Sequence, residues 1–593
     1  MSFKKISQTF STNVSLRPFM FICFILILVA TMQTNLFKSS SLIQRGLNIV
    51  TKQNRFQSKE PLIKEQTNLK DLLSIHVNQT LESTVQCVGS LYNQSCLFQN
   101  LYYVDSTFIM LIVKGRSLPT YSVRTNAFDF RSLTPNKREF DTYADLELFV
   151  RHVIFPKWFP YVTLYFSQPW HFNIGHALFD GLYPAYVAMI RFSPRHLHPF
   201  RILAGIDDCS DCWSEDVYSR FAGLGIVKQN VLNKLSTNRW YVFEEMIMGS
   251  GTMCQRCNQP NLQLAGGVEL DASRLFRDRM YQQHGFVPLI RRYQSSAEHR
   301  TLHSVLQAYV IDNKRFTPND REAINDAIKE IHNYTYSHMN QAEKQLNDDL
   351  EWPLINVTYI YYQSIKAQNM SALSVNATRI DSRSPTYEIL DSNFMAQLKL
   401  LHQMDIHITG PGTGQMYQTF LSDGSVSINI GGIRPQGVHD TSKAYTSFLE
   451  QHMTSGAPYL KGLYYPINER QKGIRKEHIV ELIRQAGRLI LQGFRIPVNP
   501  RENLAPDGQL FIEMCELDRQ FCELVTTRSP DHEYRCLDLW VEDFVHEDQQ
   551  WKQGGYIYSG RNISCPFNRT LLYELRKKYG IEHRTGNSSE STQ

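Results

Sequence analysis

A stretch of twenty residues without a charge, Pro18 to Phe37, most constrains what this chain can fold into. A helix of that length rises about 30 Å, the thickness of the hydrocarbon layer of a membrane. Lys4, Lys5 and Arg17 precede it, and basic residues stay on the cytoplasmic side of a membrane. The sequence therefore predicts a single-pass type II anchor over 18–37, with a cytoplasmic tail over 1–17 and the rest of the chain in the lumen.

A cleaved signal peptide is the alternative interpretation of the same stretch. Such peptides also place basic residues before an apolar segment, but that segment is shorter and ends at small residues. Ala30-Thr31-Met32 is a poor cleavage site of this kind. The anchor is the better match, and its short apolar span suits a thin early-secretory membrane.

Cysteines and sequons in the remainder of the chain fit an oxidising, glycosylating lumen. One of the eleven cysteines, Cys23, lies in the predicted anchor, and the other ten are an even number, as a disulfide framework needs. Nine Asn-x-Ser/Thr sequons are predicted to carry glycans, at Asn78, Asn93, Asn333, Asn356, Asn369, Asn376, Asn562, Asn568 and Asn587.

Two CxxC elements, Cys209-x-x-Cys212 and Cys254-x-x-Cys257, have three interpretations. Their spacing fits four zinc thiolates, and each element alone fits a redox motif. In an oxidising compartment, disulfides that tie two loops together are favoured over zinc and redox chemistry.

Length and composition set the number and kind of domains. At 593 residues, with 42% hydrophobic and 20% charged residues, the chain is globular and too long for one core. Its net charge of +5 forms no basic stripe, so no nucleic-acid partner is expected. We expect a stem over 38–80, α/β domains over 81–295 and 296–500, and a disulfide-stapled extension over 501–593.

Short apolar runs alternate with helical patterns from about residue 100 onward, which predicts an α/β fold. In the first domain we expect strands at Phe108–Val113, Val162–Phe166, Arg201–Ala204 and Glu245–Met248, and a helix at Ala272–Tyr281. In the second domain we expect strands at Ala308–Ile311 and Asn356–Tyr362, and a helix at Asp320–Ile331.

A glycine-rich turn is the clearest local signal of the second domain. A predicted strand over Asp405–Thr409 leads into Gly410-Pro411-Gly412-Thr413-Gly414 and a short helix from about Gln415 to Leu421. Glycine allows a ligand to approach the backbone closely, and amides at a helix start attract phosphate. The pattern fits a nucleotide site or, equally, a tight turn with nothing bound.

The first domain contains a histidine and a carboxylate four residues apart on a predicted helix. His176 and Asp180 share one helical face, and a carboxylate beside an imidazole raises its basicity, as a general base needs. His171, just before the helix, is a further polar candidate. A pair that only tethers the helix is the structural alternative.

Three segments in this order resemble glycosyltransferase family 61, which includes secretory β-1,2-xylosyltransferases and N-acetylglucosaminyltransferases. NIGHALFDGLYP, from Asn173, is similar to the family's Asn-x-x-His-x-x-x-Asp signature. YVFEEMIMG, from Tyr241, followed by FRDRMY, is similar to its middle strand and helix. DIHITGPGTGQMYQTFLSDGSVSINI, from Asp405, resembles its strand, glycine turn, helix and Gly-Ser-Val segment.

The resemblance implies a GT-B-like fold, in which two Rossmann-type domains enclose a cleft. It also implies an inverting transfer, without metal or other cofactor, from a nucleotide sugar that is usually UDP-linked, to a glycan or glycoprotein acceptor. A membrane-anchored enzyme of this family is expected in the Golgi, with the endoplasmic reticulum as the alternative.

The resemblance also assigns roles to residues. The catalytic base is His176 or Asp180, with His171 and Asn173 on the acceptor side. The leaving diphosphate is expected to bind Lys314, Arg315 and the turn residues Gly410, Gly412, Thr413, Gly414 and Gln415, with no metal. Pro411 stands where the family has a histidine, so an inactive glycan-binding relative is one alternative. A CxxC-based oxidoreductase is the other.

Overall fold

The structure is a computed structural model with Thr80–Gln593 as one compact unit and Met1–Gln79 as a second. It describes residues 80–89, 94–125, 132–192, 198–208, 213–249, 272–287, 305–313, 315–342, 351–360, 394–433, 444–445, 457–470, 472–496, 498, 502, 504–518, 556–558, 561–563 and 568–580. The predicted tail, anchor and stem, 1–79, lie outside these residues. Among the helices that are described, none has the length and apolar composition to cross a membrane.

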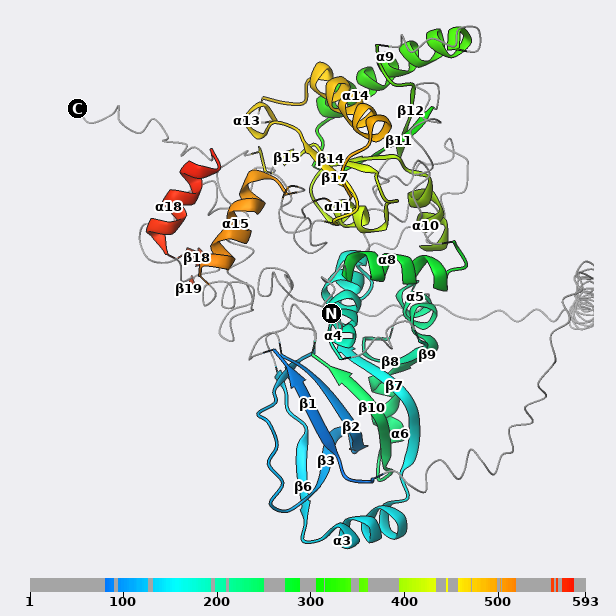
Figure 1. The fold of residues 1–593 in the computed structure, drawn as a ribbon, viewed down its shortest axis with the longest axis vertical. Helices are drawn as coiled ribbons and strands as arrows, with labels where there is room; N and C mark the ends of the chain where they lie inside the picture. The colour runs from blue at the N-terminus through cyan, green and yellow to red at the C-terminus, as the bar shows by residue number, and fades with distance from the viewer. Residues whose placement is uncertain are drawn as a thin grey trace, which may run out of the picture. The chain divides into compact units, whose positions relative to one another are not determined.

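The first sheet has eight strands, in the order β6-β3-β2-β10-β7-β8-β9, with β1 also paired to β2 (Figure 1). Its strands are β1 (Thr84–Val88), β2 (Ser95–Val104), β3 (Thr107–Val113), β6 (Asn136–Phe140), β7 (Lys157–Ser167), β8 (Phe200–Gly205), β9 (Gly223–Lys228) and β10 (Tyr241–Met248). β7 runs parallel to β8 and β10, and β8 to β9. β2 runs antiparallel to β1, β3 and β10.

Helices cover both faces of this sheet. They are α3 (Tyr143–Leu148), α4 (Tyr183–Ile190), α5 (Trp213–Ala222), α6 (Gln229–Leu235) and α8 (Ala272–Gln283), with π-helices η3 (Phe149–Ile154) and η4 (His176–Leu182). Side chains of η4, α4, α5 and α8 form one apolar cluster with β7 and β8, whereas Leu232 of α6 joins the cluster on the other face.

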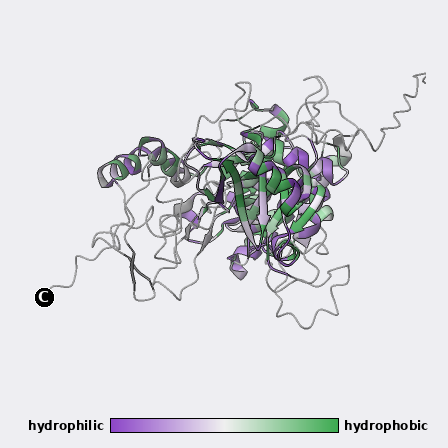
Figure 2. Cartoon of the chain, turned by 90° about the horizontal axis from the view of Figure 1, so that it is seen from below, coloured by the Kyte–Doolittle hydropathy of each residue, from purple (hydrophilic) through white to green (hydrophobic). Residues whose placement is uncertain are grey.

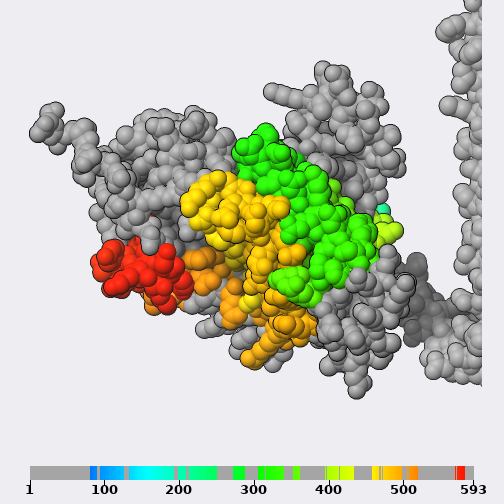
Figure 3. All heavy atoms as spheres, turned by 90° about the horizontal axis from the view of Figure 1, so that it is seen from above, coloured from blue at the N-terminus to red at the C-terminus, as the bar shows by residue number. Residues whose placement is uncertain are grey.

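The second sheet is parallel throughout, in the order β12-β11-β13-β14-β17. Its strands are β11 (Leu306–Ile311), β12 (Ile355–Ile360), β13 (Ile406–Thr409), β14 (Val426–Asn429) and β17 (Lys461–Tyr464). α9 (Pro318–Ala342) and α14 (Lys476–Gln492) lie together on its apolar face and are joined by ion pairs of Glu330 with Lys476 and Arg484 (Figure 3). α10 (Phe394–Gln403), α11 (Thr413–Met416) and the 3-10 helix η8 (Tyr417–Phe420) lie toward the other face (Figure 1).

Helix α8 joins the two sheet regions through one shared core. Arg277 of α8 is buried, donates to the backbone oxygen of Leu421 at 3.0 Å and pairs with Asp423 at 2.7 Å. The Tyr281 hydroxyl donates to the Phe420 oxygen at 2.7 Å. One apolar cluster therefore contains side chains of α4, α5 and α8 together with those of α10 and η8. In Figure 2 the hydrophobic colour is prominent on the strands in the centre, and the surrounding helices carry both hydrophobic and hydrophilic residues.

Smaller elements complete the described chain. They are the two-residue strands β4 (Val123–Arg124), β5 (Ser132–Leu133), β15 (Gly432–Ile433) and β16 (Ala444–Tyr445), the hairpin β18 (Tyr556–Tyr558) and β19 (Arg561–Ile563), and helices α13 (Ile467–Arg470), α15 (Pro506–Leu517) and α18 (Arg569–Lys578). A disulfide joins Cys87 to Cys96 between β1 and β2, and Cys515 of α15 is disulfide-bonded as well.

The α/β class and the expected strands are confirmed, with shifted ends. β12, for example, begins one residue earlier than expected and is described to Ile360. Two expectations are wrong in part. The first domain is not a purely parallel Rossmann sheet, because β2 adds antiparallel pairs. The short helix after the glycine turn begins at Thr413 and changes to 3-10 geometry at Tyr417. The domain boundary near 295 stays a prediction.

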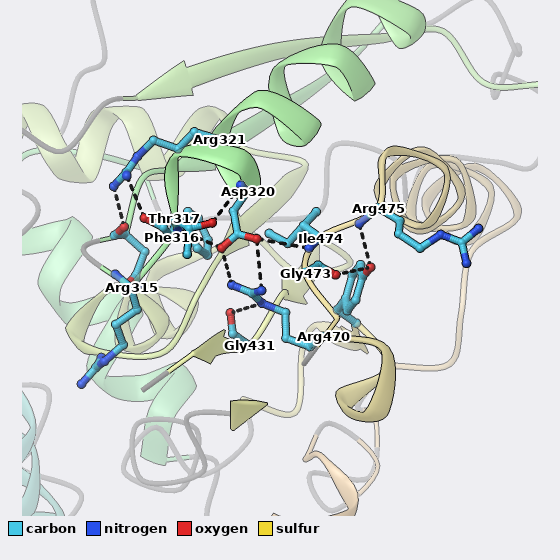
Figure 4. Close-up of polar contacts among 12 residues, drawn as sticks. Arg315, Phe316, Thr317, Asp320, Arg321, Gly431, Arg470, Gly473, Ile474 and Arg475 are labelled. Atoms are coloured by element: carbon cyan, nitrogen blue, oxygen red, sulfur yellow. Dashed lines mark hydrogen bonds and ion pairs between the residues drawn. The ribbon is translucent and has the colours of Figure 1, made fainter. Parts of the chain in front are cut away.

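A buried ion pair fixes the carboxyl edge of the second sheet (Figure 4). Arg470 of α13, with no exposed surface, donates to both carboxylate oxygens of Asp320 in α9, at 2.8 and 3.2 Å. Asp320 also accepts from the backbone amides of Thr317 at 2.9 Å and Ile474 at 3.1 Å. Arg470 Nε donates to the Gly431 oxygen at 3.3 Å. This network joins the start of α9, the end of β14 and the start of α14.

Replacing Asp320 by alanine is expected to destabilise the fold by about 3–5 kcal/mol, because it leaves the Arg470 charge buried without its partner. Chemical denaturation of the purified protein measures the change. Asp326→Ala is the matched control on the same helix, since its ion pair with Lys329 is exposed and is expected to leave the midpoint unchanged. Equal midpoints for the two variants would contradict the structural role given to Asp320.

Candidate active site

The order of strands predicts where each sheet binds ligands. In open α/β sheets the ligand crevice lies beyond the carboxyl ends of two neighbouring strands whose crossovers leave on opposite faces. In the first sheet, the predicted base His176 lies beyond the carboxyl end of the central strand β7, in the segment that leads into α4. In the second sheet these strands are β11 and β13, since α9 follows β11 on one face and α11 and η8 follow β13 on the other.

At the first of these positions, a buried glutamine connects the residues that follow β7. The backbone amide of Trp170 donates to Gln168 Oε1 at 3.1 Å, and Gln168 Nε2 donates to the His176 oxygen at 3.1 Å. Gln168 has no exposed surface, so these bonds are shielded from water. The ring centroids of Trp170 and His176 lie 5.4 Å apart. Neither Gln168 nor Trp170 could be predicted from the sequence, because neither belongs to a recognisable motif.

His176 and Asp180 form the pair that the sequence predicts. Nδ1 of His176 is hydrogen-bonded to Oδ2 of Asp180, with the carboxylate fully buried and the imidazole 33% exposed. An ionised carboxylate only accepts, so Nδ1 is the donor, and in the neutral imidazole Nε2 is then the nitrogen that carries the lone pair. The pair lies on a π-helix instead of the expected α-helix, and π-turns are common at functional sites.

A glycine in the same helix allows it to lie close to β7. A Cβ at Gly181 would be 3.3 Å from both Gln168 Cβ and the Phe166 ring. Any side chain there would press on the glutamine that connects Trp170 to His176.

The other two predicted acceptor-side residues have structural contacts. Asn173 Oδ1 accepts from the backbone amides of Gly175 at 2.9 Å and His176 at 3.4 Å, so it caps the start of the helix. His171 is fully buried with Nδ1 2.8 Å from Ser214 Oγ, and burial lowers its pKa. Of the two predicted histidines, only His176 therefore presents an exposed imidazole.

At the second position, the glycine turn after β13 is bonded to the loop after β11. Asn313 Nδ2 and Arg315 Nη1 donate to the Pro411 oxygen at 2.8 and 2.7 Å. Gly412 has a φ of 128°, which favours glycine, and a Cβ there would be 3.1 Å from Arg315 Nη1. At Gly410 a Cβ would be 2.7 Å from the Phe316 ring. The turn therefore brings Arg315, Gly410 and Gly412, three of the residues predicted to bind the donor, close together.

Arg321 holds the loop that contains Arg315. Its guanidinium donates to Asp312 Oδ1 at 2.9 Å and to the Asn313 oxygen at 2.9 Å. It also donates to the Phe316 oxygen at 2.7 Å (Figure 4). Lys314 lies outside the described residues, so its predicted role stays a prediction. Nothing is described for the Thr413 side chain, and Gly414 is buried within α11.

Gln415 points into the protein instead of toward a ligand at the turn. Its Nε2 donates to Gln418 Oε1 at 3.0 Å and to Ser427 Oγ at 3.4 Å, while Ser427 Oγ lies 3.2 Å from His407 Nδ1. Within the described ranges, His407 Nε2 and Gln415 Oε1 have no hydrogen-bond partner. These side chains form a buried polar layer between the second sheet and α11.

The two candidate positions are linked by ring contacts. Phe179 of η4, next to Asp180, lies with its ring centroid 6.2 Å from that of Phe420 in η8. η8 follows α11 directly in the chain, so the helix with His176 packs against the segment that continues from Gly412.

Some of the predicted glycosylation sites lie within the described residues. Asn333 and Asn568 are exposed, Asn356 is half-buried with Nδ2 donating to Gln307 Oε1 at 3.1 Å, and Asn562 lies in β19. Asn78, Asn93, Asn369, Asn376, Asn587 and both CxxC elements lie outside the described residues. In the part of the chain that is described, no three His, Cys, Asp or Glu side chains are grouped as metal ligands.

The chain matches no protein-family model, and no curated protein is similar to it. The resemblance to glycosyltransferase family 61 therefore stays a prediction from the three motifs.

The buried His407 predicts how stability depends on pH. Burial lowers its pKa to about 3, whereas an unfolded histidine titrates near 6.5. Between these values only the unfolded chain binds the proton, so stability falls as the pH drops below 6.5. Between pH 7.5 and pH 5, the His407 imidazole is expected to lower the free energy of unfolding by about 2 kcal/mol.

Denaturation midpoints of wild type and His407→Gln at several pH values test this expectation. The variant is expected to lose less stability than wild type between pH 7.5 and 5. His152→Gln, at an exposed position of η3, is the control and is expected to follow wild type. An unchanged pH dependence in His407→Gln would contradict the prediction.

Proposed function

We propose that this protein is an inverting glycosyltransferase that moves a sugar from a nucleotide sugar, UDP-linked, to a glycan or glycoprotein acceptor. One observation carries the proposal. The predicted base lies beyond the carboxyl end of the central strand β7, and the predicted donor residues lie beyond the carboxyl ends of β11 and β13, where an α/β sheet of this order binds ligands. The contact between Phe179 and Phe420 supports placing both groups in one site.

His176 is the proposed base. Its Nε2 accepts the proton of the acceptor hydroxyl as that oxygen forms a bond to the anomeric carbon of the donor sugar. The bond from that carbon to the diphosphate oxygen breaks on the opposite side, and its electron pair leaves with the nucleotide diphosphate. The buried Asp180 carboxylate orients the imidazole through Nδ1 and stabilises the imidazolium that forms.

Arg315 and the glycine turn are proposed to bind the leaving diphosphate. Arg315 supplies positive charge at the edge of the second sheet, and Gly412, without a side chain, lets the diphosphate approach the backbone beside the Arg315 guanidinium. Gly410 lets the turn pack on the Phe316 ring. Asn313 and Arg321 hold the Arg315 loop and the turn in this geometry. The family resemblance adds that neither metal nor another cofactor takes part.

The predicted anchor over 18–37 completes the proposal. It would hold the enzyme in the Golgi membrane as a single-pass type II protein, with Thr80–Gln593 in the lumen and the sequons open to glycosylation. The endoplasmic reticulum is the alternative location.

Hydrolysis of UDP-N-acetylglucosamine and UDP-xylose by the purified protein tests the proposal, with His176→Ala and Gly412→Ala as variants. His176→Ala is expected to lower kcat about 100-fold or more, because it removes the base. Gly412→Ala is expected to raise the donor KM, since its Cβ presses on Arg315. Gly115→Ala is the matched control, at a positive φ of 83° with nothing within 4 Å, and is expected to retain wild-type rates.

Different results identify the alternatives. Equal turnover by wild type, His176→Ala and Gly412→Ala would remove both proposed roles. Glycan binding without hydrolysis or transfer from either donor would favour an inactive glycan-binding relative. Titration of free thiols at the CxxC elements would favour the oxidoreductase.

A further inference from the structure

The Trp170 side chain lies beside the proposed base and is partly open to solvent. It is 38% exposed, which places it among the large apolar side chains that the fold leaves uncovered. Its ring centroid is 5.4 Å from that of His176, and the two planes are inclined by 50°. A partly exposed indole beside the proposed base offers an apolar surface to a bound group.

The backbone around Trp170 is fixed by hydrogen bonds. Its amide donates to the buried Gln168, and its oxygen accepts from the Asn173 amide at 3.0 Å. Gln168 also binds the backbone oxygen of His176. A bound group in contact with the Trp170 ring would therefore be held at a set position relative to the imidazole.

We infer that Trp170 forms one wall of a subsite for a pyranose ring whose hydroxyl or anomeric carbon reacts beside His176. An indole offers a broad apolar face, and the C–H groups on one face of a pyranose form a matching apolar surface. The hydroxyls at the ring edge then point toward polar groups, of which His176 is the neighbour. This inference rests on the proposed function and extends it by naming a sugar as the group bound at this position.

Two sugars could occupy such a subsite, the acceptor's terminal residue or the sugar carried by the donor. Both offer the same chemistry to the indole. A peptide hydroxyl acceptor does not offer a flat C–H face, so it would gain nothing from Trp170.

Steady-state kinetics with Trp170→Phe and Trp170→Leu test the inference. Phenylalanine retains a flat ring, whereas leucine retains apolar volume without one. Transfer from UDP-N-acetylglucosamine and UDP-xylose is measured to methyl pyranosides and to a Ser/Thr peptide, together with donor hydrolysis. Tyr573→Ala, at an exposed aromatic residue of α18, is the control and is expected to match wild type.

The Leu variant is expected to raise the KM for the sugar about tenfold, and the Phe variant to raise it much less. A change confined to the pyranoside KM identifies the acceptor sugar, and a change confined to the donor KM in hydrolysis identifies the donor sugar. A purely structural role predicts equal effects of Phe and Leu, with a lower thermal midpoint. The inference would be overturned if both variants had the same KM values as wild type, or the same change as each other. Transfer to the peptide alone would also overturn it.

The outcome is separable from that of the proposed function. If wild type neither hydrolyses a donor nor transfers a sugar, the proposed function fails. Binding of an oligosaccharide, measured by calorimetry, then still tests Trp170. Loss of that binding in Trp170→Leu but not in Trp170→Phe would support the subsite, and unchanged binding in both would overturn it.

Discussion

The buried ion pair of Asp320 and Arg470 determines the geometry of the second sheet's carboxyl edge. Neither side chain reaches solvent, so each charge depends on the other and on the backbone groups around them. The pair joins the first turn of α9 to the end of β14 at Gly431. The loop between β11 and α9 is therefore held at its α9 end, and Arg321 holds its middle. A site built on such a loop is formed before a ligand arrives, which lowers the entropy lost on binding.

Features encoded locally could be predicted from the sequence. His176 and Asp180 are four residues apart, so any helical turn brings them together, even though the turn is a π-turn. The glycine turn at Gly412 was recognisable because a positive φ requires glycine in a short span between two strands. Short apolar runs located the strands, because the central strands of a sheet covered on both faces are buried along their whole length.

Features that depend on distant partners could not be predicted. Arg470 is one of many basic residues, and only the fold shows that it meets Asp320, which is 150 positions away. Gln168 has no motif around it, and its role follows from two bonds to backbone groups whose positions the fold sets. The antiparallel pairing of β1, β2 and β3 could not be predicted, because the spacing of apolar residues does not depend on the direction in which a strand runs. The burial of His171 could not be predicted either, because it depends on the contact with Ser214 of α5.

The shared core around α8 has a consequence for how this chain can be divided. The Phe276 ring of α8 lies 5.3 Å from Tyr183 and 5.0 Å from Phe221, and 6.1 Å from Phe420 of the other sheet region. A fragment that ends near residue 295 would contain the rings of Phe276, Tyr183 and Phe221 but not Phe420. The side of Phe276 that faces Phe420 would then be exposed. Exposed aromatic surface of this kind promotes self-association, so the two halves are poor candidates for separate expression. They are expected to have been inherited together, as a single unit of folding instead of two exchangeable modules.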